Sequence, residues 1–190
     1  IDLHTPSVPM LLRSAVLACM CLLAAASPLH DLINANKFAE LETAPMDAID
    51  ERGPGGQTPL MMAVLSGKDE AVRILLKRGA DTTVGEQDGY TPCHGAGFQG
   101  RSEIMKLLIQ HGLQCTTDTH SDGFTPLHRA CWGKEARHAD TVRVLLKAGA
   151  PFDQPGGDGR KPIDMTSNPA TKKLLAHRAS KKGVETKVEL

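Results

Sequence analysis

Aromatic residues are scarce in this chain, which has one Trp, one Tyr and four Phe, together 3% of its 190 residues. Aromatic side chains supply much of the buried area in the cores of globular proteins. So low a content argues against the core of a globular enzyme. It is typical of small helical units whose cores are built from Leu and Ala.

The chain also has no excess of positive over negative side chains. The 22 basic and 22 acidic side chains cancel, so the total charge provides no electrostatic attraction to nucleic acid. The one basic stretch is a modest one near the C-terminus, from Lys172-Lys173 to Lys181-Lys182. We interpret this stretch as a solvated surface and expect no nucleic-acid partner.

The spacings that mark metal sites are missing as well, since neither Cys-x-x-Cys nor His-x-x-x-His occurs. Of the five cysteines, Cys19 and Cys21 lie in an N-terminal apolar run. Cys93, Cys115 and Cys131 occupy positions suited to small apolar side chains, so we predict that all three are buried and mainly reduced. The sequence therefore predicts no metal and no other cofactor.

No apolar run reaches the roughly 20 residues that span a bilayer. The run from Ala15 to Ala26 has 12 residues. It follows Met10 and Arg13 and ends in three alanines, so residues 10–26 are interpreted as a signal peptide that is cut before Ser27. The alternative is that residues 10–26 are retained as an anchor or docking helix. Residues 1–9 precede the first Met and show no usable pattern.

The last four residues, Lys187 to Leu190, resemble the retrieval signal Lys-Asp-Glu-Leu of the endoplasmic reticulum, with Val in place of Asp. An entry signal at one end and a retrieval signal at the other support each other. Together they predict a location in the endoplasmic reticulum lumen or the secretory pathway. The alternative location is cytoplasmic or membrane-associated.

What the chain does contain is a short phrase that returns at nearly equal intervals. The copies are Ser27-Pro28-Leu29-His30, Thr58-Pro59-Leu60-Met61, Thr91-Pro92-Cys93-His94, Thr125-Pro126-Leu127-His128 and Lys161-Pro162-Ile163-Asp164. Their starts are 31, 33, 34 and 36 residues apart, which is the period of a solenoid of small helical units. Ser or Thr predicts a helix N-cap that accepts an unpaired N–H, and Pro suits the first helical position.

The second half of each unit repeats too. Gly67 and Gly100 predict the end of a first helix. Mostly apolar helices follow at 71–76, 104–109 and 142–146, and each is closed by a glycine: Gly79, Gly112 and Gly149.

With Asp-Gly before the phrase, this pattern resembles the ankyrin-repeat family over about residues 27–180. The resemblance implies an all-α ankyrin solenoid of stacked helix-turn-helix units with divergent terminal caps. Its units would be 27–57, 58–90, 91–124, 125–160 and 161–180, and residues 181–190 would form a disordered tail. In the fourth unit three extra residues are expected in the turn between the helices, within 133–139.

The resemblance also implies roles for single residues. The recurring His30, His94 and His128 would hydrogen-bond to the backbone between adjacent units. Four aromatic residues would line the concave recognition surface, at the turn before the phrase or at the end of the first helix. With their polar surroundings they give the predicted partner-binding set of Tyr90, Phe98, Gln99, Asp122, Phe124, Trp132 and Arg160.

A stack of two-helix units offers a groove, whereas nucleophilic catalysis needs a base beside a nucleophile in a pocket. We therefore expect a non-catalytic protein–protein interaction module, an adaptor or scaffold, with another protein as its partner. We expect a monomer without a small-molecule substrate. The alternative is a membrane-tethered or structural subunit of a larger assembly, and a thiol or metal enzyme is a third, weaker hypothesis.

Overall fold

The computed structural model describes residues 28–53, 55–86 and 88–188. The predicted signal peptide at 10–26, its cut before Ser27 and residues 1–9 lie outside this part of the chain. So do the last two residues of the retrieval-like C-terminus.

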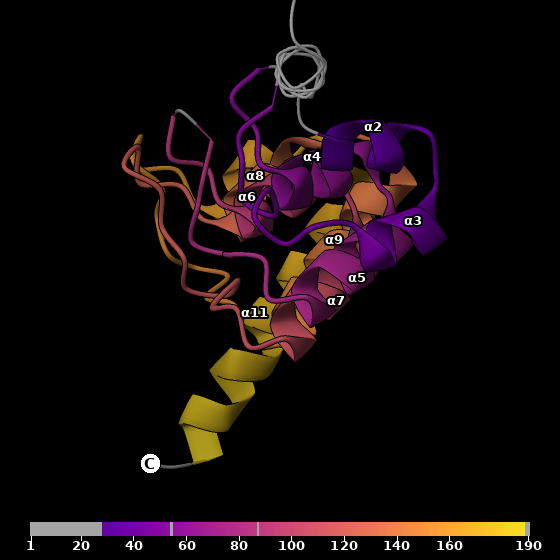
Figure 1. Cartoon of the computed structure of the whole chain (residues 1–190). Helices are drawn as coiled ribbons and strands as arrows, with labels where there is room; N and C mark the ends of the chain where they lie inside the picture. The colour runs from indigo at the N-terminus through magenta and orange to yellow at the C-terminus, as the bar shows by residue number, and fades with distance from the viewer. Residues whose placement is uncertain (1–27, 54, 87, 189–190) are drawn as a thin grey trace, which may run out of the picture.

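The described residues form paired helices and contain no strand, so the predicted all-α class is confirmed. In chain order the helices are α2 (Pro28–Asn34), α3 (Phe38–Thr43), α4 (Pro59–Ser66), α5 (Asp69–Lys77), α6 (Pro92–Gln99), α7 (Ser102–Gln110), α8 (Pro126–Trp132), α9 (Ala136–Lys147), α10 (Pro162–Met165) and α11 (Pro169–Val188). The first helices α4, α6 and α8 lie side by side in one row, and the second helices α5, α7 and α9 form another (Figure 1).

The repeated phrase begins each first helix. Pro59, Pro92 and Pro126 are the first residues of α4, α6 and α8, where a missing N–H costs no intrahelical bond. Gly67 and Gly100 end α4 and α6 in the left-handed conformation, with φ of 71° and 67°. A side chain at these two positions would be strained.

The threonine caps differ from the prediction in one respect. The hydroxyl of Thr58 accepts the backbone N–H of Met61 at 3.2 Å, as expected. The hydroxyls of Thr91 and Thr125 instead lie 2.9 and 2.8 Å from Nδ1 of His94 and His128. The difference follows from the fourth residue of the phrase, because a histidine ring competes for the hydroxyl and a methionine does not.

The recurring histidines bond to the backbone of the turn that leads from their unit into the next, as predicted. Nε2 of His30, His94 and His128 donates to the backbone carbonyls of Gln57, Phe124 and Gln154 at 2.8, 3.1 and 3.1 Å. His94 and His128 are buried, and burial lowers the pKa of both rings. The neutral rings therefore serve as fixed donors to that connecting turn.

A second set of bonds runs in the opposite direction. Arg101, just before α7, donates to the carbonyl of Leu65 at 3.1 Å, near the end of the preceding first helix. His138 in α9 bonds the carbonyl of Phe98 at the same distance of 3.1 Å. Asn168 donates to the carbonyl of Lys134, in the loop that follows α8, again at 3.1 Å. Carbonyls at or just beyond the end of a first helix are thus bound by the next unit.

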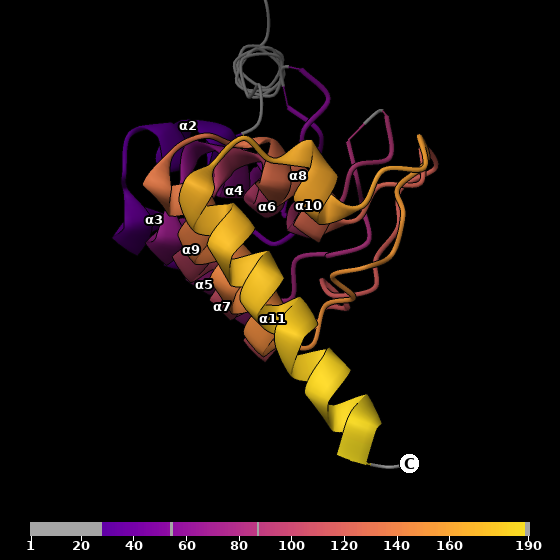
Figure 2. The same ribbon diagram turned by 180° about the vertical axis from the view of Figure 1, so that it is seen from behind.

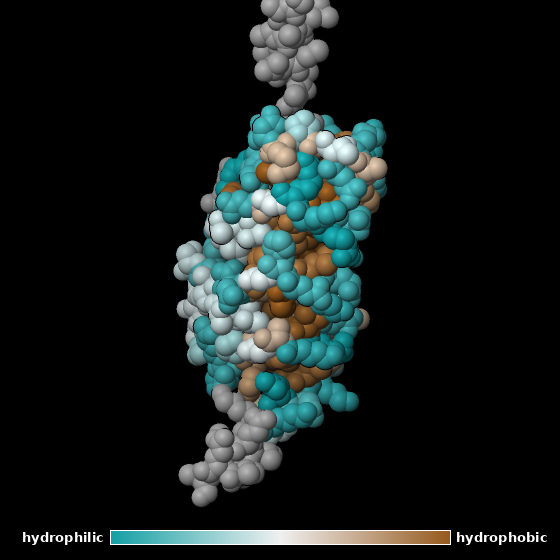
Figure 3. Space-filling view, turned by 60° about the horizontal axis from the view of Figure 1, so that its bottom comes forward, coloured by the Kyte–Doolittle hydropathy of each residue, from teal (hydrophilic) through white to brown (hydrophobic). Residues whose placement is uncertain are grey.

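The core is a continuous column of Leu, Ile, Val, Ala and Met side chains between the two rows of helices. Fully buried members include Leu60, Leu75, Leu108, Leu127 and Leu145. Figure 3 shows one face on which hydrophobic side chains form a strip along the stack, with hydrophilic side chains on both sides. Each unit is therefore buried mainly by its neighbours.

The fourth unit corrects the prediction of a long inter-helix loop at 133–139. Helix α8 ends at Trp132 and α9 already begins at Ala136. Helix α9 has 12 residues, whereas α5 and α7 have 9 each. The insertion thus lengthens the second helix, because the sequence Ala-Arg-His-Ala propagates a helix well.

The C-terminal residues differ from the prediction in a similar way. The expected disordered tail is helical as far as Val188, since α11 runs for 20 residues from Pro169. Asn168 caps this helix, and its Oδ1 accepts the N–H of Ala170 at 2.9 Å. Figure 2 shows α11 lying along α9 and then continuing past the stack. None of the helices in the described ranges is both long and apolar enough to cross a membrane.

Cys93, Cys115 and Cys131 are buried as predicted, but the reduced state was predicted wrongly for Cys93 and Cys115. Cys93 and Cys115 form a disulfide, with Cα atoms 5.1 Å apart, and Cys131 is a buried free thiol. Cys93 lies in the first turn of α6, and Cys115 follows α7 in the same unit. Folding of the helix hairpin brings Cys93 and Cys115 together in one part of the core. Their separation along the chain does not reveal this proximity.

Replacing Leu108 by Ala should lower the free energy of unfolding by about 2–5 kcal/mol, because the fully buried side chain would leave a cavity between neighbouring units. The denaturant midpoint measures this loss. Met46→Ala, at a side chain that is 50% exposed, is the control and should shift the midpoint little. Equal shifts for the two variants would contradict the described packing.

Candidate functional site

Four of the predicted residues come together on the face formed by the first helices and their turns. Tyr90 and Phe124 lie on the turns before α6 and α8, and Phe98 and Trp132 lie near the ends of these helices. The Phe124 and Trp132 rings are 5.4 Å apart, and those of Phe98 and Trp132 are 6.5 Å apart. We call Tyr90, Phe98, Phe124 and Trp132 the aromatic cluster.

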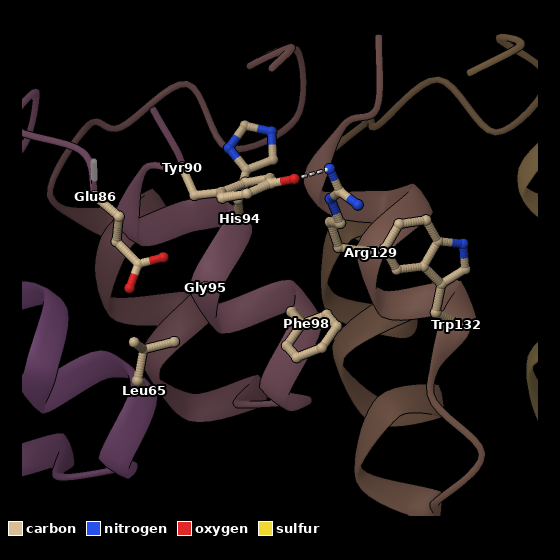
Figure 4. A pocket seen from close by; sticks show the side chains of 8 residues that line it. All are labelled: Leu65, Glu86, Tyr90, His94, Gly95, Phe98, Arg129 and Trp132. Atoms are coloured by element: carbon tan, nitrogen blue, oxygen red, sulfur yellow. Dashed lines mark hydrogen bonds between the residues drawn. The ribbon is translucent and has the colours of Figure 1, made fainter. Parts of the chain in front are cut away.

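At the centre of the aromatic cluster lies Arg129, which the sequence analysis did not single out. Its side chain is buried, and the guanidinium carbon lies 4.7 Å from the ring centre of Tyr90, 5.1 Å from that of Phe124 and 4.3 Å from that of Trp132. Nη2 donates to the Tyr90 hydroxyl at 2.8 Å (Figure 4) and to the Asp122 carboxylate. These contacts hold the rings in fixed positions by cation–π attraction and hydrogen bonds.

Asp122 connects the turn to this arrangement. Its carboxylate accepts the Tyr90 hydroxyl at 3.1 Å, the backbone N–H of Phe124 at 3.1 Å and Nδ1 of His120 at 2.9 Å. Burial alone would raise the pKa of Asp122, but the hydrogen bonds from His120, Phe124, Arg129 and Tyr90 outweigh it and lower this pKa well below its usual range. Asp122 is therefore a fixed anion that neutralises Arg129.

His120, also missed in the sequence, covers the outer face of Tyr90. The two rings are stacked at 4.0 Å with 17° between their planes, and Nε2 donates to the carbonyl of Asp88 at 2.6 Å. Desolvation lowers the pKa of His120, but the bond to Asp88 and the hydrogen bond and charge of Asp122 together outweigh it, so the pKa is raised. The ring thus favours its cationic form beside Asp122.

Beside the aromatic cluster is a cleft of about 210 Å³. It is lined by Leu65, Glu86, Tyr90, His94, Gly95, Phe98, Arg129 and Trp132. Figure 4 shows these side chains around one open space, with residues from three consecutive units. The lining is mainly apolar, and Phe98 and Trp132 remain 52% and 36% exposed at its edge.

Two residues of the predicted set lie apart from this arrangement. Arg160 is exposed and pairs with Asp158 at 2.6 Å on the turn before α10. Gln99 follows Phe98 at the end of α6 and is half-buried, and it does not line the cleft. Arg129 could have been suspected from the sequence, because it is a charged residue within an apolar first helix, at a position where its neighbours face the core.

The chemistry of this site is that of binding. Burial raises the pKa of the Cys131 thiol to about 12, so this cysteine is not an available nucleophile. In the described ranges no three His, Cys, Asp or Glu side chains come close enough together to hold a metal ion. The exposed rings and the open cleft can receive side chains of another molecule.

Asp122→Asn should lower the free energy of unfolding by about 1–3 kcal/mol, because it leaves the buried Arg129 without its anion. Asp158→Asn is the matched control. It occupies the same position of the next turn but pairs with an exposed arginine, so its loss should stay within about 1 kcal/mol.

The difference between wild type and Asp122→Asn should depend on pH in a defined direction. The lowered pKa of Asp122 stabilises the fold above the unfolded value of about 4, and this contribution is lost as pH falls through the folded pKa. The raised pKa of His120 adds stability below about pH 6.5, which is lost as pH rises through the folded value. Urea titrations should therefore show the largest difference between about pH 4 and 6, and a pH-independent difference would contradict this pairing.

Comparison with known proteins agrees with this architecture. A family model described as ankyrin repeats (3 copies) matches residues 79–155, and a single ankyrin-repeat model matches residues 55–85. Alpha-latroinsectotoxin-Lt1a of Latrodectus tredecimguttatus is 33% identical over 129 residues, which are 66% of this chain and 9% of the toxin.

Two further relatives show the same kind of partial similarity. Palmitoyltransferase AKR1 of Saccharomyces cerevisiae is 38% identical over 78 residues, which are 40% of this chain and 10% of that enzyme. Notch-regulated ankyrin repeat-containing protein B of Danio rerio is 41% identical over 61 residues, 32% of this chain and 55% of that protein. The matched repeats run together from residue 55 to 155 and coincide with the stacked helix pairs, so the chain belongs to the ankyrin-repeat family.

Proposed function

We propose that this protein is a non-catalytic adaptor that binds another protein across the aromatic cluster and acts as a monomer in the secretory lumen. Ankyrin repeats are protein-interaction modules. The observation that carries the proposal is the pair of exposed rings, Phe98 and Trp132, of which Trp132 lies over the buried Arg129 and Phe98 lies against Trp132.

Exposed aromatic side chains that are already fixed in place are effective anchors of an interface. A ring that is fixed before binding loses little conformational freedom when a partner covers it. Trp132 is held by the guanidinium of Arg129 on one side and by the edge of Phe124 on another. The partner therefore meets a preformed surface, and its side chains enter the adjoining cleft.

Three features support the lumenal part of the proposal. The sequence has a signal-like segment at 10–26 and a retrieval-like C-terminus at 187–190. The Cys93–Cys115 disulfide is independent of both. Disulfides persist in oxidising compartments and are rare where thiol reductants are maintained. If residues 10–26 were retained instead, the same surface would serve a tethered subunit, and the mass of the mature chain distinguishes the two.

The double variant Phe98→Ala/Trp132→Ala should lose capture of its partners, because both exposed anchors are removed. Each substitution alone should weaken binding at least about tenfold, the range of interface anchors. Quantitative mass spectrometry of proteins retained by the immobilised chain measures this loss. Met46→Ala removes another exposed apolar side chain away from the aromatic cluster and should leave capture unchanged. Unchanged capture by a correctly folded double variant would rule out this surface.

The lumenal assignment predicts that protein isolated from its native cell, after rapid alkylation of free thiols, contains the Cys93–Cys115 disulfide. Non-reducing peptide mapping should find these two cysteines joined and Cys131 as a thiol. Alkylated Cys93 and Cys115 in the native protein would argue for a reducing compartment and against the lumen. Recombinant protein refolded in air is the positive control for the mapping.

A further inference from the structure

The cleft beside the aromatic cluster holds a carboxylate without an opposing cation. Glu86 lies on the turn before Tyr90, and its Oε1 accepts a hydrogen bond of 2.8 Å from the neutral amide of Gln57. Among the described residues no basic side chain forms an ion pair with Glu86, since Arg129 is paired with Asp122. Arg52 uses its guanidinium for the backbone carbonyls of Gly56 and Gly85. The negative charge of Glu86 is thus available to pair with a cationic group of a ligand.

The placement of Glu86 relative to the apolar walls restricts what that ligand can be. Figure 4 shows the carboxylate directed into the space bounded by Leu65, Tyr90 and Phe98. Tyr90 also lines the cleft, but His120 is stacked on its ring and the Arg129 guanidinium carbon lies 4.7 Å from the ring centre. The site therefore combines an apolar channel and an anion within reach of one side chain.

Three classes of partner side chain can be compared in this site. A purely apolar side chain would displace water from the carboxylate of Glu86 without replacing the hydrogen bonds that the water made. An acidic side chain would be repelled by Glu86, while Arg129 is already neutralised. A basic side chain packs its methylene groups against Leu65 and Phe98 and places its cation beside Glu86.

We propose that the cleft selects a lysine or arginine side chain of the partner protein. The aliphatic stem lies between Leu65 and Phe98, and the cation binds Glu86. This inference rests on the proposed adaptor function and adds the chemistry of the residue that the partner inserts.

The test uses the full chain and a displayed library of random peptides. Selection on the wild type should enrich sequences with one constant basic position, and it shows directly whether Lys or Arg is preferred. The chain has a single tryptophan, Trp132, which lies at the cleft, so its fluorescence reports peptide binding. Replacing the basic residue of a selected peptide by norleucine should weaken binding at least about tenfold, or about 1.4 kcal/mol.

Variants of Glu86 connect this preference to one side chain. Glu86→Gln keeps an oxygen for Gln57 and should weaken the basic peptide about tenfold while leaving the norleucine peptide unchanged. Selection on the Glu86→Lys variant should instead enrich peptides that carry Asp or Glu at this position. Glu51→Gln, an identical change at an exposed carboxylate outside the cleft, is the control and should alter neither peptide.

Enrichment of acidic or purely apolar peptides would overturn the inference, and so would equal binding of the basic peptide to wild type and Glu86→Gln. If such peptides still require Phe98, the aromatic cluster remains a recognition surface and only the basic anchor is wrong. A library that yields no peptide dependent on Phe98 also rejects the basic anchor. The adaptor function itself is decided separately, by capture with the Phe98→Ala/Trp132→Ala variant.

Discussion

Each helix pair in this protein exposes apolar faces that only another pair can cover, and every other feature depends on that constraint. The pairs are joined by bonds in both directions. Histidines of the first helices bind the following turn, Arg101 and His138 bind the end of the preceding first helix, and Asn168 binds the loop that follows α8. Because buried carbonyls must find donors, these bonds fix how far one unit is displaced from the next. The position of the aromatic cluster follows from that displacement.

The aromatic cluster is a product of this stacking and does not exist within any one unit. Tyr90 lies at the end of the second unit and Phe98 in the third, whereas Arg129 and Trp132 come from the fourth. A buried guanidinium needs both an anion and hydrogen-bond acceptors, and it finds them in Asp122 and the Tyr90 hydroxyl. The charge that would otherwise destabilise the interface between the units therefore orders the side chains of the aromatic cluster.

Much of the fold could be predicted from the sequence, because the Thr-Pro phrase and the closing glycines act locally. Pro92 and Gly100 set the ends of α6 wherever the helix lies. The four aromatic residues were found from their position in the repeat. What could not be predicted depended on contacts between distant residues. The Cys93–Cys115 disulfide, the role of Arg129 and the stacking of His120 on Tyr90 all require the folded stack. The length of α9 was missed for another reason, since an insertion next to a helix can extend either the loop or the helix.

Arrays of this kind commonly change length by gaining or losing whole repeats, since each unit contacts only its neighbours. Here the partners of Arg129 straddle a boundary: Asp122 lies at the end of the third unit, Tyr90 just before its first helix, and Arg129 itself in the fourth. An extra repeat inserted at that boundary would separate the Arg129 guanidinium from Tyr90. Deletion of a repeat on either side would remove Arg129 or its partner Asp122. Because Leu65 and Glu86 of the second unit also line the cleft, three consecutive repeats are the smallest piece that descent or protein engineering can transfer with the whole arrangement intact.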